Sequence, residues 1–138
     1  MLSIQYASPA DAAYVCSASG LAESEFERKV RDGQCYILRM GAERIGVMTY
    51  QLFLDSIPFL THIHLEPLYQ RKGLGKAGMT HWENELRVHG YKMCMVSTQA
   101  DEEGQHFYRK LGYKDMGSIV MDIPPFIQPP EMFLGKAL

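Results

Sequence analysis

The segment from Gln70 to Gly75, with the sequence QRKGLG, places basic side chains and glycines directly before a stretch with a helical pattern. The N-terminus of a helix leaves several backbone N–H groups without a partner, and the helix dipole puts partial positive charge there. Glycines let a phosphate approach the main chain closely, and Arg71, Lys72 and Lys76 add full positive charges. The segment therefore predicts a site for a ligand that carries phosphate groups.

The same glycines permit a second interpretation. Gly73, Gly75 and Gly78 spell the G-x-G-x-x-G pattern of dinucleotide-binding folds, and Asp101 follows near the position of the ribose-binding carboxylate. In that fold the first strand runs almost directly into the first glycine, whereas here residues 67–72 intervene. Too little chain follows Asp101 for the further β-α repeats that the fold needs. A dinucleotide-binding protein is therefore the minor alternative.

A second sequence element, FYRKLGY at residues 107–113, follows the first along the chain. Together with LEP at residues 65–67, which ends the strand before the glycines, the two elements resemble the GNAT superfamily of N-acyltransferases. The acyl-CoA signature of that superfamily is Gln/Arg-x-x-Gly-x-Gly/Ala, and Gln70, Gly73 and Gly75 fill its fixed positions. The second element is similar to the family's Phe-Tyr-x-Lys-x-Gly-Phe/Tyr pattern.

The resemblance implies an α/β (α+β) fold in a single N-acetyltransferase domain over residues 1–138. Its sheet would be mixed and mostly antiparallel, with a central pair of parallel strands that splay apart and helices on both faces. Acetyl-CoA is the implied co-substrate, and its pantetheine arm would lie between the two parallel strands. The residues that the resemblance assigns to the cofactor are Leu65, Pro67, Gln70, Arg71, Lys72, Gly73, Leu74, Gly75, Lys76, Asp101 and Tyr108.

Asp101 departs from the family pattern, because relatives commonly carry Asn at the start of this last helix. An ionised carboxylate could cap the helix, but it cannot donate a hydrogen bond to the cofactor as an amide does. Gly104, where relatives commonly carry Ala, could give room for the pantetheine arm.

The resemblance also implies an acyltransferase that moves an acetyl group from acetyl-CoA to a primary amine by direct attack. The departing thiolate has an ordinary pKa of about 8.5 and needs a proton donor. Tyr108 matches the family tyrosine that hydrogen-bonds the CoA sulfur and protonates it. The competing interpretation is an aromatic ring packed beside Phe107 in the core.

The group that accepts the proton of the amine is left open by the sequence. His62 and His64 lie two residues apart on one strand, share a face, and have the ordinary imidazole pKa of about 6.5 that suits a base. Related enzymes often place the acceptor on the other face, where this chain offers Phe59 and Thr61, neither of which is a base. A histidine, Glu66 and an ordered water are the three candidates. A zinc site at the two histidines lacks a third ligand, so no metal is expected.

Composition limits the classes of protein. A chain of 138 residues with a net charge of −2 fits one domain with no overall attraction to nucleic acid or membrane. Cys16, Cys35 and Cys94 are odd in number and lack metal spacing, which favours free thiols in a reducing compartment. Because no signal peptide or long apolar stretch is recognisable, the sequence predicts a cytoplasmic location.

The acceptor amine is not identified by the sequence. Residues 1–27 hold Asp11, Glu23, Glu25 and Glu27 without a basic residue, which would favour a cationic amine or would simply form a solvated acidic face. The proline-rich loop 124–130 could line the acceptor pocket or form a homodimer contact. A polyamine, a drug-like amine and a peptide N-terminus are all compatible with these features. A non-catalytic acyl-CoA-binding module is the alternative function.

Periodicity and turn residues predict the elements that must position these groups. Expected strands cover residues 2–6, 35–40, 45–54, 59–65, 91–98, 113–123 and 132–134. Expected helices follow Ser8-Pro9, cover 22–32, run from the glycines to Gly90, and run from Asp101 to Gly112. Met79, Trp82 and Leu86 recur with helical spacing and should face the sheet.

Overall fold

The computed structural model describes all 138 residues, and the main sheet has seven strands in the order β1-β2-β3-β4-β5-β9-β6. Strands β4 and β5 are parallel, with Phe59 opposite Met95. The strands are β1 Leu2–Tyr6, β2 Cys35–Met40, β3 Glu43–Phe53, β4 Ile57–Leu65, β5 Met93–Gln99, β6 Lys114–Ile119, β7 Asp122–Ile123, β8 Phe126–Ile127 and β9 Glu131–Ala137. The mixed α/β fold expected from the sequence is confirmed, whereas a dinucleotide-binding fold would need repeated parallel β-α units.

Four α-helices and two short 3-10 helices accompany the strands. They are η1 Pro9–Asp11, α1 Ala12–Ser19, α2 Glu23–Arg31, η2 Pro67–Tyr69, α3 Leu74–Val88 and α4 Gly104–Lys110. None of these helices has both the length and the apolar character needed to span a lipid bilayer. The chain divides into two compact units, one formed by Met1–Gln51 and Leu60–Glu85 and the other by Leu52–Phe59 and Leu86–Leu138.

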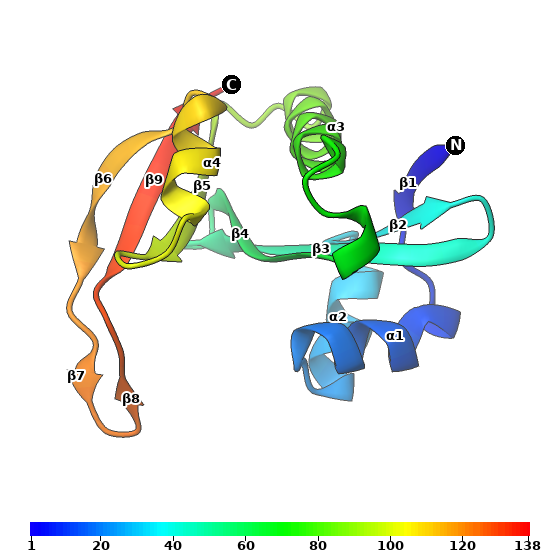
Figure 1. Cartoon of the computed structure of the whole chain (residues 1–138), viewed down its shortest axis with the longest axis horizontal. Coiled ribbons are helices and arrows are strands. Elements are labelled where there is room, and N and C mark those ends of the chain that lie inside the picture. The colour runs from blue at the N-terminus through cyan, green and yellow to red at the C-terminus, as the bar shows by residue number, and fades with distance from the viewer. The chain divides into compact units, whose positions relative to one another are not determined.

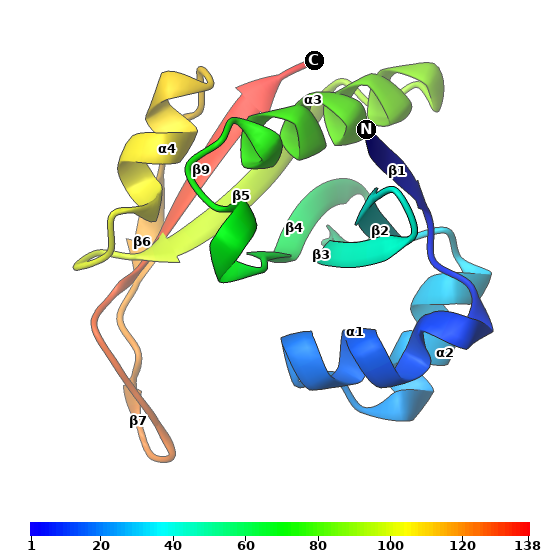
Figure 2. The same ribbon diagram turned by 45° about the vertical axis from the view of Figure 1, so that its right-hand side comes forward.

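In the first unit, helices cover both faces of β2 and β3, with α3 on one side and α1 and α2 on the other (Figures 1 and 2). The alternation of a strand explains this arrangement. Ile37 packs in the core with Phe26 of α2, whereas the ring of the neighbouring Tyr36 meets the ring of His81 on α3, with centroids 5.5 Å apart. Both faces of β2 are therefore apolar, as the sequence of this strand requires.

Helix α3 packs closely on the sheet because its inner face is apolar and contains a glycine. Met79, Trp82 and Leu86 are 1%, 0% and 0% exposed, so the predicted inner face is confirmed. A Cβ on Gly78 would lie 2.8 Å from the Met48 sulfur of β3. The third glycine of the G-x-G-x-x-G pattern thus serves helix packing on the sheet.

In the second unit, β9 pairs with both β5 and β6, and α4 packs on β5. Cys94, Leu134 and Tyr113 are buried there. The residues predicted as one long strand and a proline-rich loop form instead β6 and a small hairpin, β7 and β8, at the ends of β6 and β9 (Figure 1). The apolar side chains of this hairpin are exposed, and a homodimer contact there stays a prediction.

The prediction that the last helix opens at Asp101 is wrong. Helix α4 begins at Gly104, and its N-cap residue is Glu103. The side-chain amide of Gln105 donates to the carbonyl of Ala100 at 3.1 Å and closes a turn before the helix. Asp101 is exposed in that turn and does not cap α4. A Cβ on Gly104 would lie 2.9 Å from the Thr98 hydroxyl, so packing of α4 on β5 uses the space that the sequence suggested for the cofactor.

The three cysteines are free thiols, and Cys35 and Cys94 are buried. Burial raises the pKa of Cys35 to about 12, so this thiol is protonated and unreactive at neutral pH.

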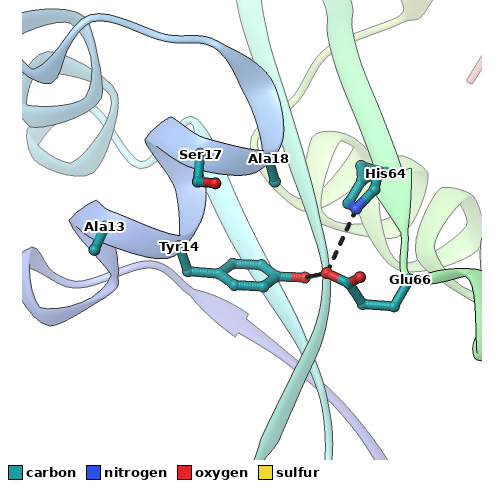
Figure 3. A pocket seen from close by; sticks show the side chains of 6 residues that line it. All are labelled: Ala13, Tyr14, Ser17, Ala18, His64 and Glu66. Carbon is teal, nitrogen blue, oxygen red and sulfur yellow. Dashed lines mark hydrogen bonds and ion pairs between the residues drawn. The ribbon is translucent and has the colours of Figure 1, made fainter.

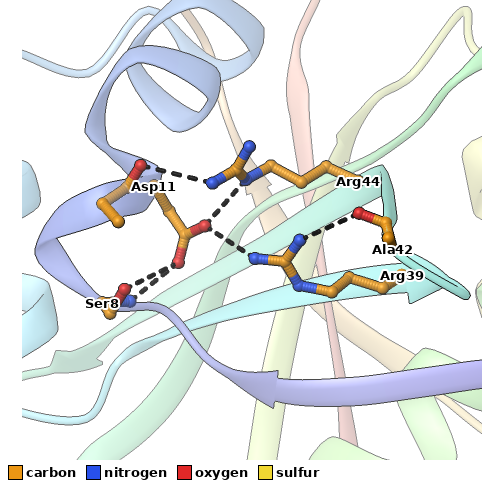
Figure 4. Close-up of polar contacts among 6 residues, drawn as sticks. Ser8, Asp11, Arg39, Ala42 and Arg44 are labelled. Carbon is orange, nitrogen blue, oxygen red and sulfur yellow. Dashed lines mark hydrogen bonds and ion pairs between the residues drawn. The ribbon is translucent and has the colours of Figure 1, made fainter.

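Asp11 connects the start of the first helices to β2 and β3 (Figure 4). It is 3% exposed, and its Oδ1 accepts from Arg39 at 3.1 Å and from Arg44 at 2.8 Å. The backbone N–H of Ser8 donates to Oδ2 at 2.8 Å. Burial alone would raise the pKa of Asp11, but the Ser8 N–H and the guanidinium groups of Arg44 and Arg39 outweigh it and hold the pKa below the usual range.

We expect Asp11→Asn to lower the free energy of unfolding by about 2–3 kcal/mol, because two guanidinium groups lose their shared carboxylate while keeping some contact with water. Urea titration measures the loss. Since the folded-state pKa is depressed, the contribution is present above the unfolded pKa of about 3.9 and is lost as pH falls below it. The difference between wild type and variant should thus begin to shrink below about pH 3.9 and disappear only as the pH falls through the lower folded-state pKa. Glu25→Gln is the control, since the Glu25–Arg28 pair is exposed and should contribute far less to stability than the buried Asp11.

Candidate functional site

The segment between β4 and α3 combines left-handed backbone residues with the start of a helix. Arg71 and Gly73 both have left-handed backbones, with φ of 60° and 80°. The carbonyl of Gly73 accepts from the N–H of Ala77 at 3.1 Å, which is the first hydrogen bond of α3. The N–H groups that precede Ala77 in this turn have no partner within the helix and can bind another acceptor. Left-handed residues beside helical ones turn successive N–H groups toward one point, so this loop can receive a phosphate.

Gln70 links this loop to the end of β4. Its side-chain amide donates to the carbonyl of Leu65 at 2.9 Å, and the N–H of Glu66 donates to the carbonyl of Ile45 at 2.8 Å. The side chain of Gln70 therefore fixes the loop to the strand rather than reaching toward a ligand. Leu65, Pro67 and the loop residues up to Lys76 are brought together in the first unit, while Asp101 and Tyr108 belong to the second.

A pocket of about 580 Å³ lies between α1 and the end of β4 (Figure 3). Its lining residues are Ala13, Tyr14, Ser17, Ala18, His64 and Glu66. The hydroxyl of Tyr14 donates to Glu66 Oε1 at 2.7 Å, and Nε2 of His64 lies 3.5 Å from the same oxygen. Burial, reinforced by the hydrogen bond to Glu66, raises the pKa of Tyr14. Its hydroxyl therefore stays protonated and acts as a donor to the carboxylate.

The two histidines of β4 lie in different surroundings. Their rings are stacked with centroids 6.4 Å apart, but only His64 lines the pocket. The Nε2 atom of His62 is buried without a hydrogen-bond partner, and burial together with the neighbouring His64 lowers the pKa of His62. On the other face of the strand, Thr61 is hydrogen-bonded to Thr49. No group of three or more His, Cys, Asp and Glu side chains is arranged to hold a metal ion.

The negative potential expected over residues 1–27 is weaker than the sequence suggested. Asp11 is neutralised by two arginines, and Glu25 pairs with Arg28 at 2.6 Å. These partners come from residues 28–44, so the count of charges within residues 1–27 missed them. The carboxylate that lines the pocket belongs to Glu66 and not to any of the acidic residues in residues 1–27.

Tyr108 lies in α4 and is 7% exposed. Its ring contacts the rings of Phe107 and Tyr113, with centroids 5.3 Å and 5.8 Å apart. Burial, with a smaller effect from the charge of Glu102, raises the pKa of Tyr108 to about 12. The ring therefore packs as the competing interpretation expected, and the hydroxyl is protonated near neutral pH, as a proton donor must be.

A loop with left-handed residues between a strand and a long helix, in a mixed α/β sheet with one parallel pair, is typical of proteins that bind phosphate-bearing cofactors. Residues 31–115 match the profile of the acetyltransferase (GNAT) domain family. The chain belongs to this family of acetyltransferases.

Solved structures agree with the family on the fold. The chain is similar to Ard1 from Thermoplasma volcanium, with a TM-score of 0.85, 13% identity, and coverage of 99% of this chain and 97% of that chain. For the ribosomal-protein-S18-alanine N-acetyltransferase from Escherichia coli, the TM-score is 0.81 at 19% identity, covering 99% and 94%. For a GNAT family acetyltransferase from Elizabethkingia anophelis with acetyl-CoA bound, it is 0.78 at 16% identity, covering 99% and 98%. Among curated proteins, no sequence matches the chain significantly.

Proposed function

We propose that the protein is an N-acetyltransferase that moves an acetyl group from acetyl-CoA to a primary amine by direct attack. The observation that carries this proposal is the loop from Gln70 to Gly75, whose left-handed Arg71 and Gly73 precede the N-terminus of α3 in a chain of the GNAT family. The solved relative with acetyl-CoA bound supports the choice of co-substrate.

In this proposal the N–H groups of Gly73, Leu74, Gly75 and Lys76 bind the pyrophosphate of CoA, and the Arg71, Lys72 and Lys76 side chains add charge. The Lys72 side chain is exposed and is accessible to a ligand, although its ammonium lies over the Tyr69 ring, 5.9 Å from the centroid. Leu65 and Pro67 border the pantetheine arm, and Gln70 holds the loop to the strand through the Leu65 carbonyl. Asp101 would make a weaker contact with the cofactor, since it lies in the turn before α4 and does not cap the helix.

Tyr108 is the proposed proton donor to the departing thiolate. With its pKa near 12, complete proton transfer to a thiolate of pKa about 8.5 is uphill by about 5 kcal/mol. A hydrogen bond from the Tyr108 hydroxyl that stabilises the negative sulfur avoids this cost, and water can then supply the proton. Tyr108 would thus act mainly as a hydrogen-bond donor to the negative sulfur.

His64 is the proposed acceptor of the amine proton. It lines the pocket next to Glu66, whereas His62 does not. Near neutral pH the amine arrives as an ammonium, which first gives one proton to the imidazole and so frees the nitrogen lone pair. The lone pair forms the C–N bond, the C–S bond breaks and its electron pair leaves with the sulfur, and the second amine proton passes through water to the thiolate.

Release of free CoA from acetyl-CoA, measured across a panel of primary amines, tests the proposal. Amine-dependent CoA release with formation of the N-acetyl product is the expected result. If acetyl-CoA binds but none of the amines is acetylated, the protein is instead a non-catalytic acyl-CoA-binding module.

Replacing Gly73 by Ala should weaken binding of acetyl-CoA about tenfold, because a methyl group would stand where the pyrophosphate must approach the main chain. A Cβ at Gly73 meets no protein atom within 4 Å, so the cost to folding is limited to the left-handed backbone, about 1 kcal/mol. Isothermal titration calorimetry with acetyl-CoA measures the affinity.

Gly41→Ala is the matched control for this experiment. Gly41 also has a left-handed backbone, with φ of 61°, and open space at its Cβ position, but it lies in the turn between β2 and β3. Both variants should lose similar stability, and only Gly73→Ala should lose affinity. Equal affinity in the two variants would show that the loop does not hold the cofactor phosphates.

A further inference from the structure

The pocket between α1 and the end of β4 contains the carboxylate of Glu66, which accepts a hydrogen bond from Tyr14. The sequence alone did not indicate a role for Tyr14. We infer that Glu66 anchors the ammonium group of the acceptor, that Tyr14 positions Glu66, and that the site selects amines that carry no carboxylate. This inference rests on the proposed amine acetylation and adds the class of acceptor to it.

The contacts of Glu66 account for its role. The Tyr14 hydroxyl donates to Oε1 at 2.7 Å, and His64 Nε2 approaches the same oxygen at 3.5 Å (Figure 3). Both contacts go to one oxygen, so Oε2 is left as an acceptor for a charged donor. Charge-assisted hydrogen bonds between an ammonium and a carboxylate are about twice as strong as neutral ones. A primary ammonium bound at Oε2 would lie next to His64, where its proton has to go.

Tyr14 holds this arrangement from another element. It reaches Glu66 from α1, 52 residues earlier in the chain, and its protonated hydroxyl can only donate to the carboxylate. A carboxylate with one oxygen fixed in this way has less rotational freedom to lose when it binds an amine. Tyr14 is thus a positioning residue, which acts on the acceptor through Glu66.

The other lining residues explain the selectivity. Ala13, Ser17 and Ala18 are small and leave room for an alkyl chain, and neither Lys nor Arg lines the pocket. The Arg44 guanidinium, whose charge acts on Tyr14, is already bound to Asp11 and to the carbonyl of Ala10. A carboxylate on the acceptor would therefore face Glu66 with no fixed cation to compensate the repulsion.

Butylamine and 4-aminobutanoate test the inference, because both carry a primary ammonium with a pKa near 10 and only the second carries a carboxylate. In the wild-type protein, we expect kcat/KM to favour butylamine by about tenfold. Glu66→Gln should reduce this preference to about twofold or less, since an amide keeps the hydrogen bond from Tyr14 but loses the charge.

Tyr14→Phe should raise the KM for butylamine about threefold to tenfold and leave the KM for acetyl-CoA unchanged. Tyr6→Phe is the matched control, because the Tyr6 hydroxyl also donates to a carboxylate, that of Glu85, at 3.0 Å. It should change neither KM. A merely structural role of Tyr14 would lower kcat and both affinities together.

Binding of butylamine to the CoA complex, followed by NMR chemical shifts, separates this inference from the proposed function. If no amine is acetylated but butylamine binds the wild type more tightly than Glu66→Gln, the site stands and the proposed catalysis fails. If the wild type acetylates butylamine and Glu66→Gln keeps both the affinity and the preference, the catalysis stands and this inference is wrong. Absence of butylamine binding to the wild type would also overturn it.

Discussion

Tyr108→Phe is expected to lower kcat about 100-fold while changing the Kd for acetyl-CoA by less than about twofold. The substitution removes only the hydroxyl that would donate to the departing sulfur. The ring contacts with Phe107 and Tyr113 are kept, so the fold of α4 should survive. Steady-state kinetics at saturating amine, together with calorimetric titration of acetyl-CoA, separate the two quantities.

Tyr113→Phe is the control for this substitution. Tyr113 is buried like Tyr108, its hydroxyl lies 3.3 Å from the Cys94 sulfur, and its ring contacts the ring of Tyr108. Loss of this hydroxyl should reduce stability by about 1 kcal/mol and leave kcat unchanged. If Tyr108→Phe retains full turnover, the hydroxyl is not the donor and Tyr108 serves only the core.

The pH dependence adds an independent check. Burial raises the pKa of Tyr108 to about 12, so the protonated form that donates is present below that pH and is lost above it. Between pH 7 and pH 10, the ionisation of Tyr108 should therefore produce no fall in kcat. If kcat falls near pH 9 in the wild type but not in Tyr108→Phe, the pKa of Tyr108 is not raised by burial as described.

The local parts of the fold and of the site could be predicted from the sequence. The loop from Gln70 to Gly75 and the start of α3 carry their own signals, since glycines and basic residues are read directly from the chain. The period of Met79, Trp82 and Leu86 likewise gave the inner face of α3. In these cases one short segment contains all of the physical information.

Features that depend on distant partners could not be predicted in this way. Strand β9 was expected to cover only residues 132–134, and the Gly135 and Lys136 that follow are poor strand formers. It extends to Ala137 because it pairs with β5 on one side and β6 on the other. The space beside Gly135 is taken by the side chain of Met116, which no local pattern indicates.

Dependence on distant partners also explains why the sequence did not predict the contact between Tyr14 and Glu66 in the pocket. Tyr14 lies in an apolar helix, and its hydrogen bond to Glu66 joins positions 52 residues apart. The capping role of Asp101 failed for a related reason, because Gln105 closes the preceding turn and moves the helix start to Gly104. Carboxylates before a helical pattern do not show where its first turn begins.

Replacement of Gly46 of β3 by Ala is expected to damage both stability and catalysis. A Cβ at this position would lie 2.5 Å from the backbone oxygen of His64 and 2.8 Å from a methyl group of Leu65. A backbone oxygen cannot rotate away as a side chain can, so the end of β4 would have to move by about 1 Å. Overpacking of this kind costs about 1–3 kcal/mol.

The catalytic effect of Gly46→Ala should exceed the loss of stability, because the displaced segment carries His64, Glu66 and the Leu65 carbonyl that holds Gln70. Misplacement by about 1 Å can lower the rate of a positioned reaction about 100-fold. We therefore expect kcat/KM for the amine to fall at least about tenfold in protein that is still folded at 25 °C. Urea titration and steady-state kinetics measure the two effects on the same preparation.

Gly78→Ala distinguishes a displaced strand from a general effect of an added methyl group. Its Cβ would be nearly as close to a neighbour, 2.8 Å from the Met48 sulfur, but that atom belongs to a flexible side chain that can change rotamer. Alanine is also favoured over glycine in a helix by about 1 kcal/mol, so stability should change little and kcat/KM should stay within about twofold of wild type. If Gly46→Ala behaves like Gly78→Ala, the end of β4 tolerates displacement, and the absence of a side chain at Gly46 does not set the position of His64 and Glu66.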